Sequence, residues 1–509
     1  MMKNKIILLS TVFSCLSAGA AEYYVANNGS NTAGNLNSHS VATPVATLSY
    51  VIRNARLTGG DTVYIRGGTY TEQVQFSSSS GGSASAGYLT IKSYANENVK
   101  FNLTTLQDWA WSFYDASSWV KYIKVDGSGN DGRRHFEVDG NKNARDCIRL
   151  QHTDHIVLQN IVVHGAINDS GGYGIRLWSI QPDSTGGGTN DHSGARYCTI
   201  SGCDIYDNDD YAVKVSGWEV FSNTVRNCQI HNNGTNGLSK YGINVSGSGY
   251  GGTVGTNFFF DCNFYSNRST GLQFTETVGN LASNCNFYSN GKNGEGNGFS
   301  FGTSASSNVV AYSASWSNNQ QGCLFYQAAN NTIHHCLLYN NGANCVELVS
   351  GAAGNRILNC TLYGSYTPIL LQGSTRNTGI TNCLVYVTGS NPVMDNSSGA
   401  TLSGSDNNCW YQPSGGSDPA MFYWNNAKRT LSQYRSLTST DNRSIKVNPA
   451  LVSPGSDFRL QSGSPCLGSG VGIGYLFGGT TPDIGAYSTV NATLIQPPTA
   501  LRVIATSTQ

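Results

Sequence analysis

The chain has 509 residues, of which only 12% are charged, and its formal net charge is zero. This balance argues against a nucleic-acid-binding protein, which needs a clustered basic surface. The 60 glycines indicate a fold that turns every few residues.

The first 21 residues have the pattern of a secretory signal. Lys3 and Lys5 precede an apolar run from Ile6 to Leu16, and small residues follow over 17–21. The pattern predicts cleavage just before Glu22. No other apolar stretch is long enough to span a membrane. We therefore expect an exported, soluble protein without a membrane span, and we expect it to be a monomer.

Residues 22–68 are expected to form a lead-in and cap. Apolar residues recur at helical spacing over 44–57, which predicts a short amphipathic helix. Such a helix would cover the open first coil of a repetitive fold, where core and strand edge are otherwise exposed. Short strands are expected at 61–65, 88–91 and 122–125.

A phrase that recurs between Ile200 and Tyr386 is the strongest pattern in the chain. Each copy contains Asn, four residues, Cys, a hydrophobic residue two positions later and Asn five positions after the Cys. The cysteines that share this column are Cys203, Cys228, Cys262, Cys285, Cys336, Cys360 and Cys383, with Ala314 in the missing rung. A period of this length, built from short β runs, predicts a solenoid whose coils stack on one core.

The cysteines themselves are interpreted mainly as buried thiols. Disulfides are the default in an exported protein, but coils stacked about 4.8 Å apart would place the column in the interior. A free Cys behaves there as a small hydrophobic residue. Cys198 with Cys203, and Cys409 with Cys466, remain alternatives as bridges. There is no Cys-x-x-Cys pair, which argues against a zinc site.

Each coil has one well-marked strand, in which alternation places hydrophobic residues inward and the middle residue outward. The outward column reads Arg149, Arg176, Lys214, Asn244, Gln273, Ser300, Leu324, Glu347 and Leu370. A turn column contains Asn208, Asn233, Asn267, Asn290, Asn319 and Asn341. Stacked Asn side chains can satisfy one another and the turn backbone, so this column is interpreted as structural.

These patterns predict an all-β solenoid over 69–395. Residues 396–488 are expected to form C-terminal coils and a loop-rich cap, and 489–509 a tail or linker. About 12 coils would span roughly 55–60 Å at the strand spacing.

Three segments carry a family resemblance: Tyr23–Ser30 (YYVANNGS), Gly60–Tyr70 (GDTVYIRGGTY) and Pro482–Tyr487 (PDIGAY). They resemble right-handed parallel β-helix proteins of the pectate-lyase-like superfamily, and the start is most similar to family 9 polysaccharide lyases. The resemblance covers nearly the whole chain after the signal. It implies a right-handed parallel β-helix, a fold that also carries hydrolases, epimerases and adhesins.

The chain departs from this family where its catalytic motif is expected. Those lyases carry an Asn-Ala-Asp-Gly-Phe-Ala run followed closely by a catalytic Lys. Here the comparable place reads Ser239-Lys240-Tyr241-Gly242-Ile243-Asn244, so that Tyr241 replaces the Asp. Catalytic residues are therefore not carried over one by one.

The outward column contains three basic residues on consecutive rungs. A lyase acting on uronates must neutralise a carboxylate and remove the proton beside it, and a Lys whose pKa is lowered by neighbouring cations can take that proton. Lys214, with Arg176 one coil away, is the predicted base, and Lys240 is the alternative. Arg176 and Arg149 are suited to hold substrate carboxylates.

Further binding residues are predicted beside these cations. Asn244 and Gln273 continue the column, and Tyr211 and Tyr241 form an aromatic column with Tyr173. Stacked packing is one interpretation of this column. The other is that a tyrosine donates a proton to the leaving oxygen.

An acidic group accompanies the basic one and suggests a calcium site. Its predicted ligands are Asp169, Asp204, Asp207, Asp209 and Asp210. Calcium accepts six to eight oxygens in irregular geometry, and resemblance to calcium-dependent lyases adds to the prediction. A solvated acidic turn is the alternative.

The sequence therefore predicts a secreted lyase that cleaves an acidic polysaccharide, such as pectate or alginate, by β-elimination with calcium. The segment 208–217 also resembles the paired-aspartate segment of family 28 glycoside hydrolases, in which grouped carboxylates act as acid and base. A hydrolase using Asp209 and Asp210 is thus the second hypothesis. The third is a glycan-binding or adhesive protein without catalysis.

Overall fold

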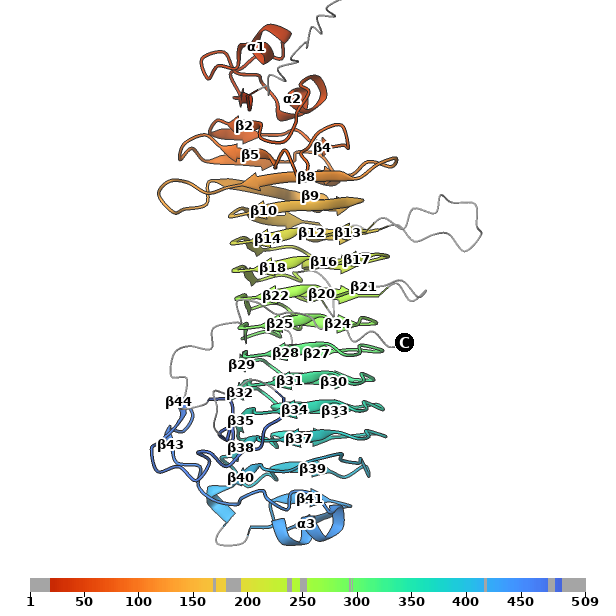
Figure 1. The fold of residues 1–509 in the computed structure, drawn as a ribbon, viewed down its shortest axis with the longest axis vertical. Coiled ribbons are helices and arrows are strands. Elements are labelled where there is room, and N and C mark those ends of the chain that lie inside the picture. Colours follow the sequence, from red (N-terminus) through yellow and green to blue (C-terminus); the bar gives the residue numbers. More distant parts are fainter. Residues whose placement is uncertain are drawn as a thin grey trace, which may run out of the picture.

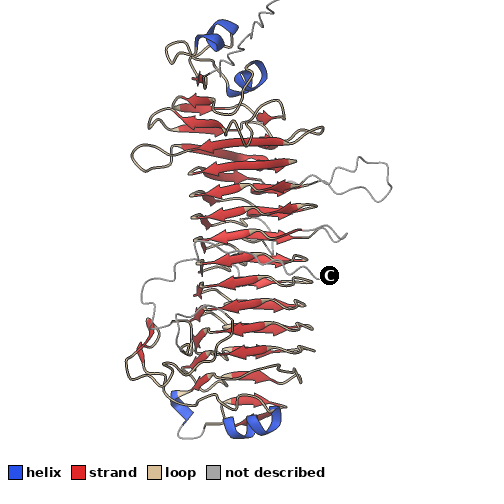
Figure 2. Cartoon of the chain, viewed as in Figure 1, coloured by secondary structure: helices blue, strands red, loops and turns tan. Residues whose placement is uncertain are grey.

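The computed structural model describes residues 19–167, 171–179, 194–235, 240–247, 254–292, 294, 296–415, 419–474 and 481–487. Most of the predicted signal, the whole predicted tail and Asp169 lie outside these residues. Within them, the chain winds into a tall stack of parallel strands with helices at both ends (Figures 1 and 2). No helix among the described residues is long and apolar enough to cross a membrane.

Three parallel ladders run along the stack, and each coil contributes a strand to each ladder. Ladder A consists of β1 (Glu22–Val25), β2 (Thr62–Ile65), β5 (Leu89–Ser93), β8 (Val120–Asp126), β10 (Thr153–Gln159), β14 (Thr199–Ser201), β18 (Thr224–Arg226), β22 (Phe258–Phe260), β25 (Leu281–Ser283), β28 (Val309–Ala311), β31 (Thr332–His334), β34 (Arg356–Leu358) and β37 (Gly379–Thr381). The short strands at its side are β13 (Ala195–Arg196), β17 (Val220–Phe221) and β21 (Val254–Gly255).

Ladder B consists of β3 (Gly68–Tyr70), β6 (Val99–Asn102), β9 (Phe136–Gln151), β11 (Val162–Ala166), β15 (Asp204–Tyr206), β19 (Gln229–His231), β23 (Asn263–Tyr265), β26 (Asn286–Tyr288), β29 (Ala314–Trp316), β32 (Leu337–Tyr339), β35 (Thr361–Gly364), β38 (Leu384–Val387) and β40 (Cys409–Tyr411). Ladder C consists of β4 (Val74–Phe76), β7 (Gln107–Phe113), the second half of β9, β12 (Tyr173–Trp178), β16 (Tyr211–Ser216), β20 (Ile243–Ser246), β24 (Leu272–Thr275), β27 (Phe299–Phe301), β30 (Cys323–Tyr326), β33 (Val346–Val349), β36 (Ile369–Leu371), β39 (Met394–Asn396) and β41 (Phe422–Trp424). The described part of each ladder thus holds 13 rungs, one more than expected.

The two ends of the stack are closed differently. At the N-terminal end, α1 (Ala33–Ser38) and α2 (Leu48–Asn54) cover the first coils, and α2 buries Leu48, Val51 and Ile52 against the core. The sequence predicted α2, although over a longer range, and missed α1.

At the C-terminal end lie η1 (Pro413–Gly415), β42 (Ala427–Arg429), which pairs with β41 in antiparallel fashion, and α3 (Leu431–Thr438). The hairpin of β43 (Leu451–Ser453) and β44 (Asp457–Leu460) returns to ladder B, where Phe458 contacts Tyr339 and Tyr363.

The core follows the alternation of the strands. Ile175 and Leu177 on β12 are fully buried, whereas Arg176 between them points outward. All 13 cysteines of the described residues are buried free thiols. The prediction of unpaired thiols is therefore confirmed, and neither alternative bridge forms.

In one coil, that of β29, the recurrent Asn and Cys pattern is one residue out of register with the prediction. Asn286 pairs with Ala314, so Ser313 and not Ala314 lies opposite Cys285. The Ser313 hydroxyl accepts a hydrogen bond from the Cys285 backbone N–H at 3.1 Å. By the same shift, Asn318 and not Asn319 belongs to the Asn column.

Two buried Asn ladders tie successive coils together. In the predicted ladder, each Nδ2 donates to Oδ1 of the next Asn, at 3.1 Å from Asn233 to Asn267 and 3.0 Å from Asn267 to Asn290. A second ladder on the other side of the coil was not predicted and runs through Asn223, Asn257, Asn280, Asn308, Asn331 and Asn355. These bonds fix the register of each coil against the next, because a shift of one residue would leave buried amides without partners.

Replacing one rung tests this role. We expect Asn267→Ala to lower the free energy of unfolding by about 1–3 kcal/mol, because it leaves the buried Asn233 backbone N–H without its acceptor, the Asn267 side-chain oxygen. The midpoint of thermal unfolding measures the effect, with the exposed Asn442→Ala as the control. Equal midpoints for the two variants would show that the ladder contributes nothing to stability.

Candidate active site on ladder C

The predicted outward column lies on ladder C. Arg176 is the register partner of Arg149 on one side and of Lys214 on the other. Lys214 pairs in turn with Asn244, and Asn244 with Gln273. The strands β9, β12, β16, β20 and β24 are stacked in this ladder (Figure 1). Their register therefore places the five residues in one outward column, in the order that the alternation predicted.

Two of these cations share one buried carboxylate. Asp146, on β9, is fully buried. Its Oδ2 accepts a hydrogen bond from Arg149 Nε at 2.6 Å and lies 3.7 Å from Arg176 NH1. Its Oδ1 has no hydrogen-bond partner among the described residues. Burial raises the pKa of Asp146, and the two guanidinium groups oppose that shift.

Sequence reasoning missed Asp146, although a signal for it exists. Asp146 is the register partner of Tyr173, so it occupies the rung that precedes the tyrosine column. Extending that column back by one coil would have found it.

Aromatic rings enclose the two arginines. The guanidinium carbon of Arg176 lies 4.0 Å from the ring centroid of Trp178 and 5.1 Å from that of Tyr173. The guanidinium carbon of Arg149 lies 5.1 Å from the Trp109 ring. Such contacts favour a cation and limit its access to water. The sequence analysis did not predict Trp109 and Trp178 as neighbours of the arginines, because tryptophan does not recur at one position of successive coils.

Lys214 is the amine best prepared to act as a base. Its Nζ donates hydrogen bonds to neutral acceptors, the side-chain oxygen of Asn244 and Ser246 Oγ, the latter at 2.8 Å. Burial lowers the pKa of Lys214 to about 8, Arg176 adds to the shift, and Asp210 opposes it. About one tenth of the amine is neutral at pH 7 with that pKa.

Lys240, the alternative base, lies in a different environment. Its Nζ lies 3.0 Å from Asp210 Oδ1, at ion-pair distance from a carboxylate. The Nζ atoms of Lys214 and Lys240 lie 5.2 and 5.7 Å from the centroid of the same Tyr211 ring. The two amines are thus near each other, but only Lys240 forms an ion pair with Asp210.

The predicted tyrosine column is a continuous stack. Ring centroids are 5.6 Å apart from Tyr173 to Tyr211 and again from Tyr211 to Tyr241, and the planes are nearly parallel. Burial raises the pKa of the Tyr211 phenol, which therefore keeps its proton. The stacking supports the packing interpretation. The Tyr211 phenol lies beside Lys214 and keeps its proton, so the donation of that proton to a leaving oxygen stays a prediction.

The predicted calcium ligands contact cationic or imidazole groups. Asp209 Oδ1 lies 3.0 Å from Lys142 Nζ, which also lies 3.4 Å from Asp207 Oδ1 and donates to the Asp207 carbonyl oxygen at 2.9 Å. Asp204 contacts His231 Nε2 at 2.9 Å, and Asp210 contacts Lys240. Asp169 lies outside the described residues.

These four aspartates do not converge on one metal position. The oxygens of Asp207 and Asp209 are of the type that calcium prefers, but the cation they hold is the Lys142 ammonium. Lys142 reaches them from the corner of β9, where Asn141 and Lys142 both have left-handed backbone angles. The only described group with metal-like spacing is Glu137, Asp139 and His164 on ladder B, where Lys100 bridges the two carboxylates at 2.7 Å each.

Comparison with known proteins supports the fold. The family model described as "Right handed beta helix region" matches residues 239–385. The chain is a right-handed parallel β-helix. No curated protein sequence matches it.

Among solved structures, the β-helix is similar to that of pectate lyase Pel9A, at 17% identity over 92% of this chain and 97% of that one, with a TM-score of 0.45. It is also similar to the A-module of the Azotobacter vinelandii mannuronan C-5 epimerase AlgE4, at 17% identity over 77% and 91%, with a TM-score of 0.41. A complex of XylC with xylose matches at 12% identity over 77% and 83%, with a TM-score of 0.41.

The contacts of Lys142 predict how the protein responds to calcium. We expect calcium to leave the thermal midpoint of the wild type unchanged, because the Lys142 ammonium already lies between the carboxylates of Asp207 and Asp209. In Lys142→Ala the freed oxygens can accept a hard cation, so calcium should raise the midpoint of this variant and a chelator should reverse the rise. A calcium-dependent rise in the wild type would contradict this account and would support the calcium site predicted from the sequence.

Proposed function

We propose that this β-helix is a polysaccharide lyase that cleaves a uronate-containing polysaccharide, such as pectate or alginate, by β-elimination. One observation carries the proposal: Lys214, with its lowered pKa, lies one rung from Arg176, which shares a single carboxylate with Arg149 on the rung beyond. This arrangement offers a base and an excess of positive charge on adjacent rungs. Export, predicted from the first 21 residues, is part of the proposal.

Each step follows from the position of these groups. Arg176, with Arg149 beside it, would bind the carboxylate of one sugar unit and stabilise the charge that develops when the neighbouring carbon loses its proton. The neutral amine of Lys214 takes that proton. The electron pair of the broken C–H bond forms a carbon–carbon double bond, and the glycosidic C–O bond at the next carbon breaks. The departing oxygen then takes a proton from solvent or from the Tyr211 phenol.

The two catalytic lysines predicted from the sequence are not equivalent in this proposal. Lys240 is paired with Asp210 and so suits substrate binding, whereas the pKa of Lys214 is lowered. The calcium assistance expected from the resemblance and the acidic residues is not part of this proposal, because Lys142 holds Asp207 and Asp209. No step above depends on it.

A hydrolase is the second candidate, and one observation favours it. Burial raises the pKa of Asp210, as the acid of a glycosidase requires, although Lys240 opposes that shift. Asp209 is the carboxylate that would have to act as the base, but it is engaged by Lys142. These ion pairs place the hydrolase second.

A single assay separates the candidates. The protein is incubated with polygalacturonate and with alginate while the ultraviolet absorbance of an unsaturated sugar end and the release of reducing ends are followed. We expect both signals, with a loss of about 10²–10⁴-fold in Lys214→Ala, the range of general-base catalysis. Lys240→Ala should lose less, and the exposed Lys428→Ala should match the wild type.

The other outcomes would each contradict the proposal in a distinct way. Reducing ends without the chromophore, lost in Asp210→Asn, would indicate a hydrolase. Neither signal, with retained binding, would indicate a glycan-binding protein. Full lyase activity in Lys214→Ala would show that the base is another residue.

A further inference from the structure

A cavity of about 300 Å³ lies beside the candidate active site, at the start of β7. Its lining residues are Gln73, Leu106, Gln107, Asp108, Trp109 and Arg145. The volume is at the lower end of the range of ligand cavities in proteins, about 300–1,000 Å³, and suits a single sugar ring. None of the steps of the β-elimination uses this cavity.

The strand register joins the cavity to the candidate active site. Trp109 on β7 is the register partner of Asp146 on β9. Asp146 pairs with Tyr173, and Tyr173 with Tyr211, whose ring Lys214 approaches. Trp109 is thus three rungs, or roughly 14 Å at a strand spacing of about 4.8 Å, from the coil of the proposed base. A polymer that runs along the outward face of ladder C therefore passes from Lys214 to the cavity.

The charged groups of the cavity are paired. Asp108 and Arg145, the charged residues of the described lining, form an ion pair with each other. Arg149 borders the cavity, with its guanidinium carbon 5.1 Å from the Trp109 ring centroid, and its Nε donates to Asp146 Oδ2 at 2.6 Å. A free sugar carboxylate in the cavity would have to compete with Asp108 for the same guanidinium, whereas an uncharged sugar would not.

The uncharged groups of the lining match those of a sugar ring. The Trp109 indole and the Leu106 side chain, which is 49% exposed, present apolar surface that can pack against the C–H bonds of a sugar. The side-chain amide of Gln73 donates to the Trp109 carbonyl at 2.9 Å, and that of Gln107 donates to Thr105 Oγ1 at 3.3 Å. These bonds use the amide N–H groups and leave the amide oxygens to accept hydrogen bonds from sugar hydroxyls.

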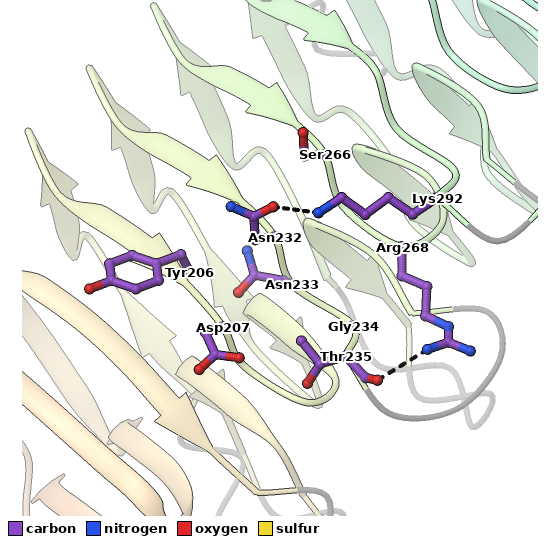
Figure 3. Close-up of a pocket in the computed structure, with 9 residues that line it drawn as sticks. All are labelled: Tyr206, Asp207, Asn232, Asn233, Gly234, Thr235, Ser266, Arg268 and Lys292. Atoms are coloured by element: carbon purple, nitrogen blue, oxygen red, sulfur yellow. Dashed lines mark hydrogen bonds between the residues drawn. The ribbon is translucent and has the colours of Figure 1, made fainter.

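A second cavity, of about 330 Å³ and lined by Tyr206, lacks such an aromatic surface (Figure 3). Tyr206 is stacked between His164 and His231 at centroid distances of 4.8 and 5.2 Å, so both faces of its ring are covered. No aromatic ring of the described residues lies against the half-buried Trp109. Of the two cavities, the one at Trp109 therefore offers an aromatic surface to a ligand.

We propose that the cavity at Trp109 is a subsite for a sugar unit without charge, either a neutral hexose or a uronate whose carboxyl group is esterified. The inference rests on the proposed function for the identity of the polymer and narrows its class to an acidic polysaccharide in which uncharged units occur among charged ones. The cations of ladder C hold the charged units. The cavity holds an uncharged unit three rungs from Lys214.

Binding of size-matched octamers tests the subsite. Octamers of polygalacturonate and of alginate are prepared in three forms: with free carboxylates, with part of the carboxylates methyl-esterified, and with part of them reduced to neutral alcohols. Isothermal titration calorimetry is carried out in the Lys214→Ala background, so that turnover does not consume the ligand. We expect Trp109→Ala to weaken binding of the two modified forms about tenfold, because one aromatic contact is lost, and to leave binding of the free octamer nearly unchanged.

Leu106→Lys is a second variant, which the fold should tolerate because Leu106 is exposed. The added ammonium should strengthen binding of the free octamer and not of the modified forms, since it supplies a partner for a carboxylate. The matched control is Tyr197→Ala, which removes an exposed aromatic side chain beside ladder A and should leave binding of all three forms unchanged.

Unchanged binding of the modified octamers in a folded Trp109→Ala variant, checked by its thermal midpoint, would overturn the subsite. An equal loss for free and modified octamers would overturn its preference for an uncharged unit, and failure of every form to bind would overturn the ligand class. A loss confined to the esterified form would support the subsite and identify its ligand as an ester. A loss confined to the reduced form would support it and identify a neutral hexose.

The outcomes also separate this inference from the proposed function. If the wild type produces no unsaturated sugar but binding of the modified octamers needs Trp109, the lyase proposal fails and the subsite stands. If lyase activity is present and binding of the modified octamers ignores Trp109, the reverse holds.

Discussion

The register between successive coils is the constraint on which every other feature of this protein depends. Parallel strands place residue against residue, and the buried Asn ladders on two sides of the coil prevent slippage, because each amide needs the one above it. The outward positions of ladder C are thereby held in line. Side chains that are 27 or 38 residues apart in sequence, such as Arg149, Arg176 and Lys214, become neighbours.

Neighbouring cations destabilise the folded protein by mutual repulsion, but a catalyst can use their charge. Three stacked basic residues repel one another, and only part of that repulsion is offset, by the buried Asp146 that Arg149 and Arg176 share. Burial lowers the pKa of Lys214, and the remaining repulsion from Arg176 adds to that shift. The other acidic residues, Asp209, Asp210 and Asp204, are in contact with Lys142, Lys240 and His231 respectively. The site is therefore electropositive where a uronate carboxylate would lie.

The sequence predicted the fold and the ladder C column because both follow from local periodicity. Alternation with period two identified Arg176 and Lys214 as outward residues, and the recurrent Asn and Cys identified the rungs. The Ala314 assignment was wrong because Ser313 performs the hydrogen bonding of the missing Cys, which residue identity alone does not reveal. Asp146 and Lys142 were missed for a different reason. Asp146 replaces a tyrosine in its column, and Lys142 reaches Asp207 across 65 residues through a left-handed corner of β9.

The ionisation of Lys214 tests most directly whether the register creates the site. Its pKa can be measured by nitrogen-15 NMR titration of labelled lysine, in the wild type and in Arg176→Met. We predict a pKa of about 8 in the wild type and a higher value in the variant, because removing the cation on the adjacent rung stabilises the ammonium. A value near the ordinary pKa of about 10.4 in both proteins would contradict the account, since it would show that the stacked arginine and lysine do not interact.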